Sequence, residues 1–165
     1  MQLRKPISKE TAQQRLETLC VAAEHCRFEL EEKLRRWGLP ADEREEVLAT
    51  LEKARFFDDA RFAKAYVRDK VVYNRWGRQK VSMGLYAKRI DRSLIDEAFD
   101  ELNPEDYEDA ALRYLEAKAR SVKEGFTYEG RTKLYRSGIS RGFESALVAR
   151  LVKNPKIWGI DPDEA

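Results

Sequence analysis

The chain has 165 residues, a formal net charge of +2, 42% hydrophobic residues and 38% charged residues, which suits one ordinary domain or several small modules that share surfaces. Charges of both signs alternate with recurring apolar residues, a composition that favours helices with solvated faces over a disordered chain. No apolar run approaches the roughly 20 residues that span a bilayer, and no signal-peptide core is present, so we expect a cytoplasmic protein whose Cys20 and Cys26 are reduced.

A basic arm over residues 1–10 precedes the first set of predicted helices. Apolar spacing predicts one helix over 11–26 and a second over 28–37, which ends at Gly38. Pro40 makes the turn into a third helix. The inward-facing residues of that third helix are Val47, Leu48 and Leu51.

Three further short helices are predicted between Phe56 and Leu102. Phe62 and Tyr66 are four residues apart and stack on the buried face of the first, whose start is capped by Asp58 and Asp59. The second runs from about Arg78 to Lys88. The third begins at Asp91 and buries Leu94, Ile95, Ala98, Phe99 and Leu102.

The last third of the chain is predicted to repeat this order. A helix starts at Asn103-Pro104, a loop covers 124–130, and a short second helix covers 131–137. After Lys153 comes an acidic tail in which Trp158 is predicted to dock on the bundle.

Apolar positions match between the three sets of helices. A shift of 51 residues aligns Leu30 and Leu34 of the first set with Val81 and Leu85 of the second. A further shift of 49 aligns Ile90 with Ile139 and Val81 with Gly130 of the third set. The sequence therefore predicts an all-α protein of three tandem three-helix units. Their predicted bounds are 1–57 with the basic arm, 58–103, and 104–165 with the tail.

No arrangement typical of an enzyme is present in the sequence. Asp58-Asp59 could be a metal-binding pair, but a helix cap explains the two carboxylates more simply. Cys20, His25 and Cys26 offer three possible ligands without a second cluster, which favours a structural role. There is no phosphate-binding loop or nucleophile motif. We therefore expect a binding protein that is not an enzyme and needs no metal or cofactor.

The middle unit carries a one-signed run of charge between residues 68 and 92. That stretch contains eight Lys and Arg residues but only two acidic residues, Asp69 and Asp91. The eight are Arg68, Lys70, Arg75, Arg78, Lys80, Lys88, Arg89 and Arg92. Tyr73, Trp76 and Tyr86 are interleaved with them, as expected for phosphate contacts beside stacking surfaces, although Trp76 and Tyr86 fit a buried role equally well. Arg35 and Arg36 could extend this positive track.

The middle unit also contains sequence motifs of a known family. The motifs are Phe57-Asp58-Asp59-x-Arg61-Phe62-Ala63-x-Ala65-Tyr66-Val67, Gly77-Arg78, and Leu85-x-x-Lys88-Arg89-Ile90-Asp91-x-x-Leu94-Ile95-x-x-Ala98. With Phe28-Glu29-Leu30-x-x-Lys33-Leu34-x-x-Trp37-Gly38-Leu39 in the first unit, the chain resembles the RecX family of regulators of the RecA recombinase. The resemblance covers roughly residues 11–152.

This resemblance implies an elongated, curved helical protein that binds the groove of the RecA–DNA filament. Such proteins hinder extension of the filament or promote its disassembly, which restrains recombination and the SOS response. The eight cations are then candidate contacts to RecA or to DNA, and we expect the protein to act as a monomer. The alternative is a module that binds DNA weakly, without sequence preference and without RecA.

Overall fold

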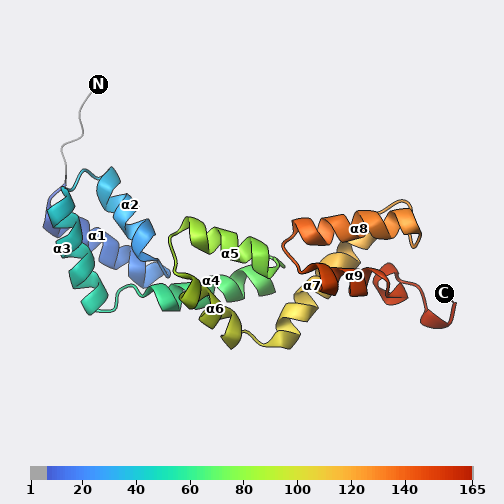
Figure 1. The fold of residues 1–165 in the computed structure, drawn as a ribbon. Helices are drawn as coiled ribbons and strands as arrows, with labels where there is room; N and C mark the ends of the chain where they lie inside the picture. The colour runs from blue at the N-terminus through green and yellow to red at the C-terminus, as the bar shows by residue number, and fades with distance from the viewer. Residues whose placement is uncertain (1–6, 165) are drawn as a thin grey trace, which may run out of the picture.

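The computed structural model describes residues 7–164, and within that range the chain forms nine α-helices and no β-strand. Two short 3-10 helices follow, at Pro155–Trp158 and Pro162–Glu164. The helices succeed one another along an elongated molecule, with the first three at one end and the last three at the other (Figure 1). The predicted all-α class with tandem three-helix units is thereby confirmed. None of the described helices is long and apolar enough to cross a bilayer.

The first unit consists of α1 (Lys9–Ala22), α2 (Arg27–Arg36) and α3 (Ala41–Lys53). The Ser8 side chain accepts a hydrogen bond from the amide of Thr11, so α1 begins two residues before its predicted start. It ends at Ala22 rather than Cys26, because residue 26 serves as the N-cap of α2. Residues 1–6 of the predicted basic arm lie outside the described residues, and Lys9 belongs to the first turn of α1.

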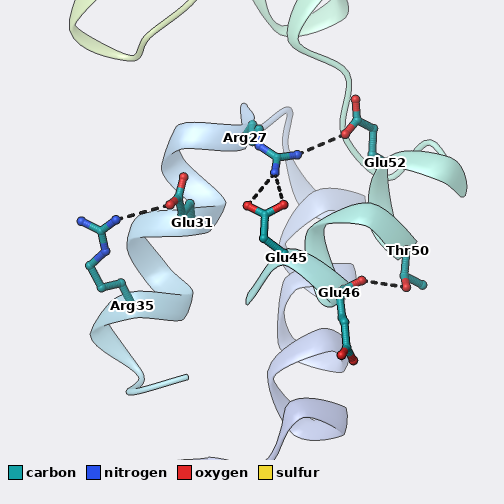
Figure 2. Close-up of polar contacts among 7 residues, drawn as sticks. All are labelled: Arg27, Glu31, Arg35, Glu45, Glu46, Thr50 and Glu52. Carbon is teal, nitrogen blue, oxygen red and sulfur yellow. Dashed lines mark hydrogen bonds and ion pairs between the residues drawn. The ribbon is translucent and has the colours of Figure 1, made fainter. Parts of the chain in front are cut away.

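Arg27 ties the start of α2 to α3. Its guanidinium lies 2.9 and 3.1 Å from the two carboxylate oxygens of Glu45 and 3.2 Å from Glu52 (Figure 2). One nitrogen, Nη2, is shared between the two oxygens of Glu45, and Nη1 contacts Glu52, so the guanidinium joins two carboxylates of α3. Beneath it lies an apolar core. That core includes Leu30, Leu34, Val47, Leu48 and Leu51, all fully buried.

The second unit consists of α4 (Asp59–Val72), α5 (Arg78–Ala87) and α6 (Arg92–Glu101). Asp58 is the predicted N-cap of α4, and its carboxylate accepts a hydrogen bond from the amide of Arg61 at 3.1 Å. Asp91 stands at the N-cap of α6 without a side-chain hydrogen bond to the helix. Of the predicted core positions, four are buried: Phe62, Ile95, Ala98 and Phe99. Tyr66, Leu94 and Leu102 are only partly buried and pack against that core.

The third unit consists of α7 (Pro104–Ala119), α8 (Tyr128–Ser140) and α9 (Ser145–Val152). The Thr127 side chain caps α8 by accepting a hydrogen bond from the amide of Gly130. Helix α8 therefore starts three residues before the predicted boundary and also ends three residues later. The predicted loop over 124–130 is shorter than expected because its last three residues are helical.

The turn between the second and third helices has the same form in all three units. One residue has a positive φ angle, and the next is buried and donates its amide to a carbonyl five residues earlier, at 3.2, 3.1 and 3.2 Å. These residue pairs are Gly38 and Leu39, Arg89 and Ile90, and Gly142 and Phe143. Ile90 therefore corresponds to Phe143, and Val81 to Leu134. The predicted shift of 49 residues, which placed Ile90 on Ile139 and Val81 on Gly130, is wrong by about one helical turn.

The buried side chains form two cores rather than three. One core contains only side chains of α1–α3 and the turns beside them, including Leu39 and Phe57. The other runs continuously through α4–α9 and includes Ile157 of the first 3-10 helix. Cys26 belongs to this second core although it precedes α2. The second and third units thus share one apolar interior, and the first unit joins them through the loop that carries Cys26.

Candidate functional site

The eight cations of the predicted site divide into two groups. Arg78 and Arg92 lie 2.9 and 3.8 Å from carboxylate oxygens of Asp96. Lys88 lies 2.7 Å from Glu29. The other five make no ion pair among residues 7–164, and they are Arg68, Lys70, Arg75, Lys80 and Arg89. Three of the eight cations therefore pair with a carboxylate, and both carboxylates belong to residues outside the basic run.

Lys88 and Arg89 lie at the junction between the first and second units. Glu29, the partner of Lys88, also lies 2.8 Å from His25 Nδ1. Burial disfavours the ionised carboxylate of Glu29, but hydrogen bonds with Lys88 and His25 outweigh it and lower its pKa. The guanidinium of Arg89 lies over the ring of Phe28, 5.1 Å from its centre. Both cations thus hold α2 against the end of α5.

Arg35 does not extend the positive track. Its guanidinium lies 3.3 Å from Glu31 and 3.6 Å from Glu32, both on the same helix, and the contact to Glu31 is drawn in Figure 2. Acidic side chains one turn away therefore offset its charge.

The most concentrated unpaired charge surrounds Trp76, in the loop between α4 and α5. The Lys70 ammonium of α4 lies 4.8 Å from the centre of the indole, and that of Lys80 from α5 lies 4.6 Å from it. Lys70 also lies 5.4 Å from the ring of Tyr66. We call Lys70, Arg75, Trp76, Lys80 and Arg141 the Trp76 cluster. Its four cations make no ion pair within the described part of the chain, whereas its aromatic ring attracts positive charge.

Arg141 reaches this cluster from the third unit and holds the loop in place. Its guanidinium donates hydrogen bonds to the carbonyl oxygens of Asn74 and Arg75, the latter at 3.1 Å. Its own carbonyl accepts a hydrogen bond from Gly77 at 3.0 Å. The same guanidinium lies 4.9 Å from the ring centre of Tyr114. The loop that carries Trp76 is therefore fixed by contacts to the turn between α8 and α9.

The backbones of the second and third units come very close at this junction. A methyl group added to Gly77 would lie 2.1 Å from the carbonyl carbon of Gly142, so only glycine fits there. The amide of Arg78 donates to the Tyr107 hydroxyl at 2.9 Å, and that hydroxyl donates to Glu144 at 2.6 Å. Burial and the bond to Glu144 raise the pKa of Tyr107. The start of α5 is thus capped by groups from the third unit.

A groove of about 730 Å³ lies between α4, the end of α6 and the start of α7. Arg61 and Lys64 line it but pair with Glu24 and Glu101 at 2.7 and 2.8 Å. Arg68 is the lining cation that makes no ion pair among residues 7–164. Acidic side chains also line this groove, so its charge is mixed and the Trp76 cluster is the better candidate site.

The residues considered for metal binding or catalysis have structural contacts instead. No cluster of three or more His, Cys, Asp or Glu side chains suited to a metal occurs among residues 7–164. Asp58 caps α4, and Asp59 accepts a hydrogen bond from the amide of Arg27 at 2.8 Å. Cys26 is buried, and His25 contacts Glu29. The cap expected at the start of α4 is therefore made by Asp58, whereas the side chain of Asp59 bonds to the start of α2.

Sequence reasoning missed Arg141 as a member of the site. Arg141 lies far from the basic run in the sequence. It belongs to the third unit, which the repeat comparison aligned with the second unit four residues out of register. The signal that could have found it is the repeated turn, because Arg141-Gly142 occupies the place of Trp37-Gly38 and Lys88-Arg89.

The fold and the site together define a class of protein, an array of three-helix units whose middle unit presents unpaired cations around an aromatic side chain. Residues 58–98 match the family model described as RecX, second three-helix domain. This match and the relatives below support the resemblance to the RecX family seen in the sequence motifs.

Individual relatives carry the same name. Over 138 residues, 82% of this chain, it is 28% identical to Regulatory protein RecX of Clostridium beijerinckii, and it spans 63% of the length of that relative. Identity to Regulatory protein RecX of Streptomyces coelicolor is 27% over 128 residues, which cover 77% of this chain and 68% of the relative.

Solved structures share the fold. A crystal structure of regulatory protein RecX matches with a TM-score of 0.79 at 20% identity, over 88% of this chain and 72% of the other. RecX from Lactobacillus salivarius matches with a TM-score of 0.78 at 18% identity, over 92% and 97% of the two chains. At these identities the likeness establishes the fold.

Proposed function

We propose that this protein binds the RecA–DNA filament and acts there as a non-enzymatic inhibitor. Bound protein would inhibit RecA ATPase activity, filament extension and strand exchange, and so restrain recombination and the SOS response. A chain of helical units offers a long surface to such a filament, as repeat proteins do. The partner is then the filament as a whole, protein and DNA together.

The observation that carries this proposal is the Trp76 cluster within the unit that matches the RecX family. A filament that contains DNA presents phosphate groups, which attract unpaired cations. We further propose that Arg68, Lys70, Arg75 and Lys80 make the contacts with the filament. Arg78, Lys88, Arg89 and Arg92 would act indirectly, by maintaining the shape of the surface.

The same cluster supports a second candidate function, sequence-independent binding of DNA without RecA. Cations mixed with an aromatic side chain suit a nucleic-acid strand whether or not a protein coats it. The two candidates differ in whether the effect of the protein depends on RecA.

A RecA activity assay distinguishes these functions. DNA-dependent ATP hydrolysis and strand exchange by RecA are measured with increasing amounts of this protein. We expect the rate of ATP hydrolysis and the yield of strand exchange to fall at concentrations of this protein that are too low to coat the DNA directly. Inhibition that appears only when the protein saturates naked DNA would favour the second candidate, and no inhibition at any concentration would refute the proposed function.

A further inference from the structure

We propose that Lys70, Trp76 and Lys80 form a clamp for a phosphodiester group of a DNA strand. The inference rests on the proposed function for its setting, a filament that contains DNA, and it names the part of that filament which the Trp76 cluster contacts. The clamp uses one residue each from α4, the α4–α5 loop and α5.

The two ammonium groups of the clamp lie beside the same ring. They lie 4.8 and 4.6 Å from the same indole centre, so their separation cannot exceed the sum of these distances. No carboxylate within the described residues pairs with either lysine. Like charges at this range repel each other, and an anion between or beside them relieves that repulsion. The arrangement is therefore suited to a bound anion.

The clamp also contains a hydrogen-bond donor without a protein acceptor. The Trp76 indole is half-buried, and among residues 7–164 its N–H makes no hydrogen bond to protein. That N–H is not a buried unsatisfied donor, so it is open to solvent and to a ligand. Two ammonium groups and one indole N–H are all donors, whereas the oxygens of a phosphodiester are all acceptors. A strand carries such groups at regular intervals, so Arg75 in the same loop can contact a second phosphate.

The clamp is fixed before any ligand arrives. Arg141 holds the carbonyls of Asn74 and Arg75, and the amide of Gln79 donates to the Gly142 carbonyl at 3.1 Å. Contacts on both sides of Trp76 thus anchor the loop to the third unit. A loop that is already ordered loses less conformational entropy when it binds its ligand.

Binding of DNA alone tests the clamp. Fluorescence anisotropy of a labelled oligothymidylate is measured across a range of salt concentrations, without RecA, for the wild type and for K70A/K80A. We expect the double variant to bind about tenfold more weakly at low salt. The slope of log affinity against log salt should decrease by about 0.7 for each lysine removed.

Two control variants separate loss of the clamp from other effects. K118A/K153A removes two exposed lysines that make no ion pair in the described structure, and it should change the salt slope far less. K70R/K80R keeps both charges and should bind like the wild type. Circular dichroism and thermal unfolding show whether each variant is folded. If the folded K70A/K80A protein keeps the wild-type affinity and slope, the clamp is refuted.

The outcome for the clamp is distinguishable from that for the proposed function. If K70A/K80A binds DNA normally but no longer inhibits RecA, the lysines contact protein, so the clamp fails while the function stands. If the wild type never inhibits RecA but needs both lysines to bind DNA, the clamp stands while the function fails.

Discussion

Cys26 is the residue through which the first unit enters the core of the other two. Its side chain is fully buried among residues of α4–α9. Burial raises the pKa of its thiol to about 11. Cys20 on α1 is only half-buried, although burial raises the pKa of its thiol as well. The two thiols therefore differ both in how easily a reagent reaches them and in how strongly burial raises their pKa.

This difference predicts selective alkylation. The thiolate is the reactive form, and a pKa of about 11 instead of 9 leaves about one hundredth as much thiolate at pH 8. Iodoacetamide should label Cys20 of the native protein much faster than Cys26, and a denaturant should make the rates similar. Peptide mass spectrometry measures both rates. Equal rates in the native protein would show that Cys26 is not held in the shared core.

Lys70 and Lys88 show what the sequence can and cannot reveal about single residues. Both belong to the basic run and both were predicted to be contacts. Lys88 lies beside Glu29, which is 59 residues earlier, whereas Lys70 lies over the rings of Tyr66 and Trp76 and pairs with no carboxylate among residues 7–164. The charge of a residue follows from the sequence, but the neighbours that offset this charge are brought to it by folding. The sequence therefore locates the excess of positive charge in the middle unit without separating the paired cations from the unpaired ones.

At the scale of elements, the turn between α8 and α9 is joined to the start of α5 by hydrogen bonds between their backbones. Gly77 donates to Arg141, and Gln79 donates to Gly142, at 3.0 and 3.1 Å. The contact is possible because neither Gly77 nor Gly142 has a side chain. This junction positions the Trp76 loop, so a defect here should disturb the candidate site as well.

Substitution of Gly77 tests that junction. The added methyl of Gly77→Ala would meet the backbone of Gly142, and we expect unfolding to require about 1–3 kcal/mol less free energy. The amide hydrogen of Gln79 should exchange faster with solvent, as measured by NMR, because its acceptor moves away. Gly125→Ala is the control. Its positive φ angle of 60° strains an alanine, so stability should fall there too, but the site lies outside the junction and the exchange of Gln79 should stay as in the wild type. Wild-type protection of Gln79 in Gly77→Ala would argue against the junction.

The register of α8 shows why repeat matching succeeded for the first two units and failed for the third. Apolar residues in a helix recur about every 3.6 residues, so a shift of four keeps them on the same face. Ile139 thus looked like Ile90, although Phe143 occupies that position. The turn geometry, with a positive φ before the buried residue, fixes the register, and the third unit reaches this turn four residues later.

The whole molecule contains one smaller apolar core and one larger one. The first unit has its own core, while the second and third share another. Ion pairs and the buried Cys26 connect the two parts. We propose unit boundaries at 57/58 and 103/104, with the second boundary crossing a continuous core. The shared core and the hydrogen bonds at the Trp76 loop join the second and third units, and the three residues of the clamp all belong to the second.

The most direct test of filament binding through the middle unit is a comparison of affinities. Fluorescently labelled protein is titrated with preformed RecA–DNA filaments and, at the same salt concentration, with naked DNA. We predict at least about tenfold tighter binding to the filament than to naked DNA, a loss of about tenfold in K70E/K80E, and less than about twofold change in K118E/K153E. Equal affinity for filament and naked DNA, or filament binding unaffected by K70E/K80E, would contradict the account.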